Sequence, residues 1–190
     1  VLDAGCACWV QGPRAVGNDL RLEHEIALFD VAAGMNHLKA LGFERIVLQG
    51  TSGGAALYAF YNQQALAAPD KRIARTPGGR PTGLAELTMP VADGLVFVSP
   101  HPGQGKILLS LIDPSVIDEN NPLVSDPALD PFSAANGFKR PPTSSSYAPE
   151  FVTRYRAAQH ARVARIDAYA KGLIAAKMAA KKRFKESPSR

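Results

Sequence analysis

The chain has 190 residues, of which 46% are hydrophobic and 21% are charged, and its formal net charge is +5. This composition is typical of a globular fold with a sizeable core. It excludes a disulfide-rich scaffold, since only two cysteines are present, and a membrane-spanning helix, since no apolar run approaches roughly 20 residues. The first residues show no secretory signal pattern, so we expect a cytoplasmic protein with no membrane partner.

The positive charge gathers at one end of the chain. Residues 151–190 hold eleven Lys or Arg against two acidic residues, whereas residues 1–150 hold eleven against fifteen. Such a basic segment can bind nucleic acid or an anionic membrane surface. Because it has no base-stacking motif, we do not expect a nucleic-acid partner. A solvated face, an oligomer contact or a cap that recruits an acidic substrate is the more ordinary interpretation.

The chain opens with the pattern of a strand end at residues 1–5, followed by an irregular loop at 6–18. Cys6 and Cys8 lie too close together to close a stabilising disulfide loop and supply too few ligands for a metal. We therefore expect two small, buried thiols in a reducing compartment.

A helix is expected next, with Asn18 or Asp19 as its N-cap and Leu41 near its end. Gly42 stands where a left-handed residue terminates a helix, and Phe43 is expected to make the accompanying hydrophobic contact. A short link then leads to the next strand.

One strand-to-helix turn carries the main functional signal. Residues 46–48 form the apolar, β-branched run of a buried strand, and residues 53–66 have the Ala, Leu, Tyr and Gln content of a helix. Between them lies Gly50-x-Ser52-x-Gly54. A strand that turns abruptly into a helix strains its turn residue and lifts that side chain off the sheet. It needs small residues on either side because the two backbones nearly touch.

This turn is the pattern of a nucleophile elbow, which exposes a serine hydroxyl at a helix N-terminus. Ser52 is the predicted nucleophile. The Gly53 amide is the predicted donor to an oxyanion, where the helix dipole also favours negative charge. The alternative is a glycine-rich turn that only packs a strand against a helix, or one that cradles a phosphate.

Residues 69–90 are broken by glycine and proline and are expected to form a surface excursion. Residues 94–98 form another apolar strand, which ends at a Ser-Pro-His-Pro-Gly segment. The succession of strands and helices predicts an α/β fold with a mostly parallel sheet and flanking helices. Because ligands gather beyond the carboxyl ends of parallel strands, Ser52 and His101 are both expected at that edge.

The remaining chain loses this alternation. Residues 107–111 are expected to form one or two helical turns, residues 113–149 a loop-like segment, and residues 150–185 one long basic helix with an imperfect apolar stripe. Three apolar residues of the loop-like segment are expected to pack against another part of the chain: Leu123, Leu129 and Phe132. The long helix suits a lid or an assembly surface.

Residues 1–105 resemble the α/β-hydrolase superfamily in their order of strand, loop, helix, strand, nucleophile elbow, helix and strand. They are similar to a bacterial group whose elbow ends in Ser-Gly-Gly, here residues 52–54. That group also has a Tyr- and Gln-rich helix after the elbow, here 58–65, and a His-Pro-Gly after the next strand, here 101–103. The resemblance implies a hydrolase core portion over 1–105 and a helical cap or lid segment over 106–190.

In this family the chain order is nucleophile, acid and histidine, with the last two on later strand ends. The present sequence stops within the expected cap, without further parallel strands, so the resemblance implies the central portion of a longer hydrolase. A complete triad is therefore not assigned. We expect its His–acid pair either on remaining polypeptide or a companion chain, or at positions not identified within this one.

Two further residues are candidates for catalysis. His101, between two prolines, is a candidate general base, although a substrate contact or a loop-packing role is favoured because no acid is placed to orient it. Asp113 is a candidate triad acid, while Asp113-Pro114-Ser115 is also an ordinary turn and helix-cap signal. The histidines for which we expect no catalytic role are His24, His37 and His160.

The sequence thus predicts an esterase- or thioesterase-like serine hydrolase that cleaves a small-molecule acyl substrate through a Ser52 acyl-enzyme. No cofactor or metal is expected, and we expect a homo-oligomer. The alternative is a non-catalytic α/β-hydrolase-like binding or assembly subunit without a complete triad. A flavodoxin-like or phosphate-binding α/β domain that uses residues 50–54 as an anion loop is a third hypothesis.

Overall fold

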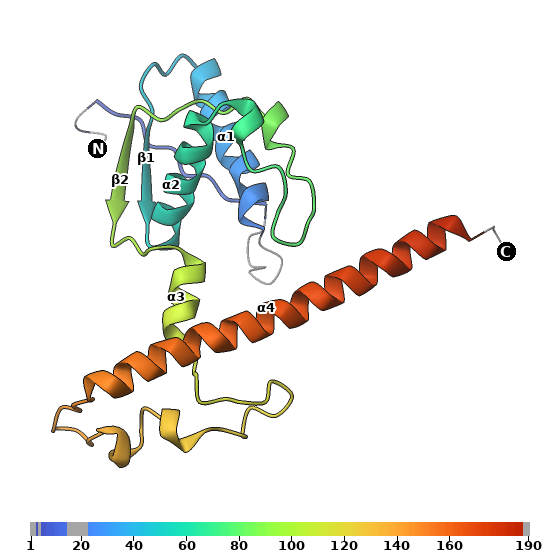
Figure 1. Ribbon diagram of the computed structural model, residues 1–190. Coiled ribbons are helices and arrows are strands. Elements are labelled where there is room, and N and C mark those ends of the chain that lie inside the picture. The colour runs from blue at the N-terminus through green and yellow to red at the C-terminus, as the bar shows by residue number, and fades with distance from the viewer. Residues whose placement is uncertain (1–2, 4, 15–22, 188–190) are drawn as a thin grey trace. The chain divides into compact units, whose positions relative to one another are not determined.

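Two helices and two strands alternate in the described part of residues 1–104. The structure, a computed structural model, describes residues 3, 5–14 and 23–187. Its first elements, shown in Figure 1, are α1 (His24–Ala40), β1 (Val47–Thr51), α2 (Gly53–Leu66) and β2 (Gly94–Val98). The chain divides into two compact units, Val1–Gln104 (unit 1) and Gly105–Arg190 (unit 2). Unit 1 has the mixed α/β content that the sequence predicts.

The sheet of unit 1 consists of β1 and β2, which pair in parallel with Val47 opposite Gly94 and Thr51 opposite Val98. Leu48 is buried on the face that α2 covers, whereas the next residues on either side of it are exposed. On the other face, Val47 and Val96 are 57% and 43% exposed. Parallel sheets are usually covered on both faces, so within the described part of the chain this sheet has one uncovered apolar face.

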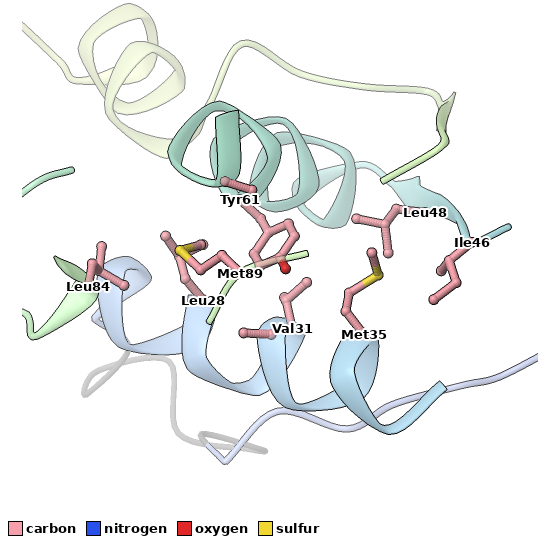
Figure 2. Close-up of a cluster of buried hydrophobic side chains, with 10 residues drawn as sticks. Leu28, Val31, Met35, Ile46, Leu48, Tyr61, Leu84 and Met89 are labelled. Carbon is pink, nitrogen blue, oxygen red and sulfur yellow. The ribbon is translucent and has the colours of Figure 1, made fainter. Parts of the chain in front are cut away.

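The hydrophobic core of unit 1 forms where α1 faces α2. Figure 2 shows the ring of Tyr61 pointing from α2 towards Val31 of α1. Tyr61 is fully buried, and its hydroxyl donates a hydrogen bond to the Pro90 carbonyl oxygen at 2.8 Å. Burial raises the pKa of this phenol, which therefore stays neutral. The labelled core residues are Leu28, Val31, Met35, Ile46, Leu48, Tyr61, Leu84 and Met89.

The segment 69–90 lies largely at the surface, as the sequence predicts, but it also contributes side chains to this core, which the sequence did not indicate. Leu84 is fully buried, and the Arg72 guanidinium donates to the carbonyl oxygens of Gln64 and Leu84. The Gln64 Oε1 atom in turn accepts the Ile73 amide at 2.8 Å. The glycines and prolines of this segment correctly predict an irregular backbone. Side-chain hydrogen bonds nevertheless fasten that backbone onto α2. Its short 3-10 helices are Pro69–Lys71 and Leu84–Glu86.

Helix α1 begins later than the sequence predicts. Its N-cap is Glu23, without a side-chain capping bond, whereas the expected caps Asn18 and Asp19 lie outside the described residues. Its end is as predicted. Gly42 has φ 90°, and the Phe43 amide donates to the Leu38 carbonyl oxygen at 3.1 Å, the hydrogen bond of a Schellman motif.

The N-terminal loop lies at the surface of unit 1. Cys6 and Cys8 are both exposed, so the expectation of buried thiols is wrong. The loop contacts α1 through other residues: Trp9 packs its ring 5.1 Å from that of His37, and Arg14 pairs with Asp30. These contacts leave the cysteine side chains outside the core. The strand expected at residues 1–5 falls largely outside the described residues, and Gly5 lies in a turn.

Unit 2 contains two helices joined by a long irregular segment. Helices α3 (Gln104–Leu111) and α4 (Pro149–Glu186) confirm the two predicted helical regions, and the segment between them holds short 3-10 helices at Pro127–Leu129 and Ala134–Asn136. Of the three apolar residues expected to pack, Leu129 is buried, and Phe132 meets Phe138 edge to face with ring centroids 5.6 Å apart, although it is 73% exposed. Leu123 is 89% exposed. The prediction is therefore wrong only for Leu123. None of the described helices is both long and apolar enough to cross a membrane.

Glu119 fastens the irregular segment of unit 2 to α4. Its carboxylate accepts hydrogen bonds from Arg162 at 2.9 Å and from Arg165 at 2.7 Å. The hydrogen bond from Arg162, together with that from Arg165, holds the pKa of this carboxyl below its usual range. Two guanidinium groups on one carboxylate make this a charged network rather than an isolated surface pair.

The hydroxyl of Tyr61 provides a stability test of unit 1. We expect Tyr61→Phe to lower the free energy of unfolding by about 1 kcal/mol, because the Pro90 carbonyl oxygen loses its donor while the ring remains. Tyr58 is a half-buried tyrosine of the same helix, and its hydroxyl has no hydrogen bond in the described structure. Tyr58→Phe should therefore change the free energy of unfolding by less than about 0.5 kcal/mol. Urea denaturation measures both, and equal values for the two variants would show that the Tyr61–Pro90 bond contributes nothing.

Candidate functional site

The carboxyl ends of the two strands bring the candidate segments of unit 1 together. Thr51 pairs with Val98, and the Ser52 amide donates to the Val98 carbonyl oxygen at 3.0 Å. Both arrows point in the same direction in Figure 1, so the segments that follow the strands leave the sheet at one edge. The turn at Ser52 and the turn at Ser99 are therefore neighbours, as the sequence predicts.

Ser52 occupies a strained backbone position between β1 and α2. Its φ of 53° and ψ of −116° form a combination that residues with a side chain rarely adopt. The side chain is exposed, and although Ser52 is the N-cap of α2, its hydroxyl makes no capping hydrogen bond. Since a serine at this position normally bonds to a helix amide, the hydroxyl is left available for chemistry.

The sharpness of the turn depends on Gly50. A Cβ atom added there would lie 2.5 Å from the amide nitrogen of Ala55 and 2.5 Å from the carbonyl carbon of Gly54. A Cβ atom added to Gly54 would meet nothing within 4 Å. The expectation that both flanking positions need a small residue is therefore right for Gly50 and, within the described structure, wrong for Gly54. Of these two glycines, only Gly50 lies in direct contact with the backbone of the first turn of α2.

The first turn of α2 offers a hydrogen-bond donor beside Ser52. Gly53 is exposed, and no described residue accepts a hydrogen bond from its amide. It is the first residue of a 14-residue helix, so this amide lies at the positive end of the helix dipole. The arrangement suits negative charge that develops next to the Ser52 hydroxyl.

His101 lies beside the same turn. A Cβ atom added to Gly53 would lie 3.3 Å from Nε2 of His101. The other ring nitrogen, Nδ1, accepts a hydrogen bond from the Gly103 amide at 3.1 Å. A neutral imidazole whose Nδ1 accepts carries its proton on Nε2, so the nitrogen near Gly53 is a donor. This geometry favours a substrate contact over the general-base role.

Asp113 belongs to unit 2. Its Oδ1 atom accepts the Ser115 amide at 2.9 Å, and its carbonyl oxygen accepts from Arg162. These bonds confirm the turn predicted for Asp113-Pro114-Ser115. Its role as a triad acid stays a prediction.

The structure places the remaining histidines on helices, with their side chains exposed. His24 lies at the start of α1, and His37 has its ring tilted against that of Trp9. His160 is exposed on α4. In unit 1, the structure therefore brings His101, and not His24 or His37, to the turn at Ser52.

Sequence reasoning missed two features of this edge. Ser99 has φ 44°, although a residue before proline is normally extended; the sequence holds no signal for this conformation. The Gly103 amide orients the His101 ring, and a His-Pro-Gly segment indicates only a tight turn, not which ring nitrogen accepts. Both features depend on how the chain leaves β2.

The chemistry of the site comes from backbone amides, a hydroxyl and an imidazole. Within the part of the chain that the structure describes, no group of three or more His, Cys, Asp or Glu side chains is arranged to hold a metal ion. Comparison with protein-family models, with curated proteins and with solved structures finds no match. The functional argument therefore rests on the geometry of this turn.

The two glycines that flank Ser52 make a matched pair for mutation. We expect Gly50→Ala to destabilise the protein by roughly 2 kcal/mol or more, because its methyl group would overlap backbone atoms that cannot move independently. Gly54→Ala, inside the first turn of α2 and facing open space, should be neutral or stabilising by up to about 1 kcal/mol through helix propensity. Denaturant unfolding of both variants checks this order, and a reversed order would contradict the close approach at Gly50.

Proposed function

We propose that this chain is a serine hydrolase of the α/β-hydrolase type, in which Ser52 attacks the carbonyl carbon of a small-molecule ester or thioester. The observation that carries the proposal is Ser52 itself, exposed, uncapped and strained between a parallel strand and a helix. A structural turn would gain from a capping bond and from a relaxed backbone. The larger parallel sheet of this fold class is part of the proposal.

The proposed reaction proceeds through an acyl-enzyme. Ser52 Oγ bonds to the acyl carbon while its proton passes to a general base, and the carbonyl electron pair moves onto the oxygen. Collapse of this tetrahedral oxyanion breaks the bond to the leaving alcohol or thiol, which takes up the proton. Water then repeats the sequence, releases the acid and restores the Ser52 hydroxyl. We assign the base and its orienting acid to polypeptide outside unit 1.

Two donors near Ser52 support oxyanion stabilisation. The Gly53 amide has no acceptor among the described residues, and His101 presents an Nε2–H beside Gly53. Donors that are fixed before the reaction stabilise developing charge without having to reorganise, and each is worth roughly 100- to 1,000-fold in rate. In this proposal His101 is a substrate-contacting donor rather than the base that activates Ser52.

A serine-directed fluorophosphonate probe tests the nucleophile. We expect a single adduct that maps to Ser52, and we expect Ser52→Ala to abolish both the adduct and the hydrolysis of an activated ester, with an unchanged circular dichroism spectrum. Ser99→Ala is the matched control, because Ser99 is also an exposed serine with positive φ at the adjacent strand end. It should keep the adduct and the activity. Intact-mass spectrometry and peptide mapping provide the measurement.

The outcomes separate the three hypotheses. An unlabelled, inactive protein would favour the non-catalytic binding subunit. Thermal stabilisation by inorganic phosphate, without any adduct, would favour an anion loop at the free amides of the α2 N-terminus. A labelled Ser52 contradicts both.

His101 is tested by two substitutions. His101→Ala should lower kcat by roughly 100-fold with little change in KM, because a donor used in the transition state is lost. His101→Gln, whose amide nitrogen can stand near the position of Nε2, should recover a large part of that loss and keep the acid limb of the pH profile. If the Gln variant lost as much activity as the Ala variant and also lost the acid limb of the pH profile, His101 would be identified as the general base.

A further inference from the structure

One face of α4 is packed along its first half. Phe151 and Gln159 are buried, and the Gln159 side chain donates to the carbonyl oxygens of Ser110 and Ile112 at 3.0 and 2.9 Å. Tyr155, on the same face, packs its ring against that of Phe151 at a tilted angle, with the centroids 5.7 Å apart. Side chains that follow one another at steps of three and four residues lie on the same face of a helix. On this face of α4, the packed part ends at Arg162.

The same face continues beyond Arg162, where its large apolar side chains are exposed in the described structure. Further steps of three and four residues lead to a set that we name the distal face: Ile166, Tyr169, Leu173, Ala176, Ala180 and Phe184. Tyr169, Leu173 and Phe184 are 70%, 55% and 82% exposed. Two ion pairs of this half, Lys171 with Asp167 and Lys182 with Glu186, run along the helix itself, whereas Arg165 pairs with Glu119 of the irregular segment.

The charge around the distal face indicates what kind of partner fits it. Residues 163–187 carry seven Lys or Arg and two acidic side chains. On a helical projection, Arg183 lies along one border of the distal face and Lys177 lies along the other. Arg165 also lies at the border with Arg183, but its guanidinium is already held by Glu119 and by the Val116 carbonyl oxygen. A second copy of this helix would bring cationic borders against cationic borders, which costs free energy. The complementary partner is therefore acidic.

The shape of the distal face indicates a helix rather than a lipid surface. The apolar stripe is narrow and follows the a/d spacing of a coiled-coil seam from Ile166 to Ala180. Ala176 and Ala180 present only methyl groups, which permit the close approach of another helix but contribute little to insertion among acyl chains. We propose that the distal face of α4 docks an acidic amphipathic helix of a partner protein, with the Arg and Lys borders paired to its carboxylates.

This docking is independent of catalysis at Ser52, and a designed probe tests it. The probe is a fluorescent peptide of about 24 residues with leucine at a and d positions and glutamate at e and g positions. Its twin carries lysine in place of glutamate. We expect the full chain to bind the acidic peptide, with an affinity that falls as salt is raised, and not to bind the basic twin. Fluorescence anisotropy measures both.

Two variants with the same change in charge locate the contact. Leu173→Glu places a carboxylate in the distal face and should weaken binding of the acidic peptide at least about tenfold. Ala175→Glu, on the opposite side of the helix, should change it less than about threefold. Circular dichroism confirms that both variants stay helical.

Three results would overturn the proposal. The first is no binding of the acidic peptide by the full chain, and the second is an equal effect of the two substitutions. The third is evidence that the distal face binds a different partner, either a membrane or a second copy of this chain. Leu173→Glu, but not Ala175→Glu, would then abolish binding to vesicles of phosphatidylcholine and phosphatidylserine, or self-association in analytical ultracentrifugation.

Discussion

The close approach of the Gly50 backbone to the first turn of α2 is the constraint on which the candidate site depends. Any side chain at Gly50 would overlap Gly54 and Ala55. With that contact in place, the chain reverses from strand to helix at one residue, which leaves Ser52 at φ 53° with its hydroxyl outside the helix. The cost of this backbone, of the order of 1–3 kcal/mol, has to be offset by packing elsewhere in unit 1.

Helix α2 supplies that packing and connects the core to the site. Its first turn carries Ser52 and Gly53, while its later residues include the buried Tyr61 and Gln64. The bonds from Tyr61 to Pro90, and from Arg72 to the backbone of α2, tie the long segment between the two strands to this helix. That segment leads directly into β2 and so sets where His101 leaves the sheet. Residues remote from Ser52 thereby position the groups around it.

Unit 2 uses charge differently along its long helix. Near Arg162 and Arg165, the cations are held by Glu119 and by backbone carbonyl oxygens, so they act as structural links. Farther along α4 the cations border an apolar stripe and have few acidic neighbours. The large positive charge of the C-terminal segment thus has two roles, and only the second leaves surface for a partner of opposite charge.

Local patterns determined the elements and the turn, and tertiary contacts decided what surrounds them. The β-branched run of β1, the glycines around Ser52 and the unbroken composition of α4 depend on neighbours in sequence, so residues 94–98 and the start of α2 were predicted to the residue. Side-chain hydrogen bonds of Arg72 that span 8 and 12 residues fasten part of the expected surface segment 69–90 onto the core. Which ring nitrogen of His101 carries the proton depends on the hydrogen bond from the Gly103 amide. The open space that the described structure leaves beside Gly54 depends on the path of α2. A one-dimensional pattern records which conformations a segment favours, but not which distant atoms will fill or leave open the space beside it.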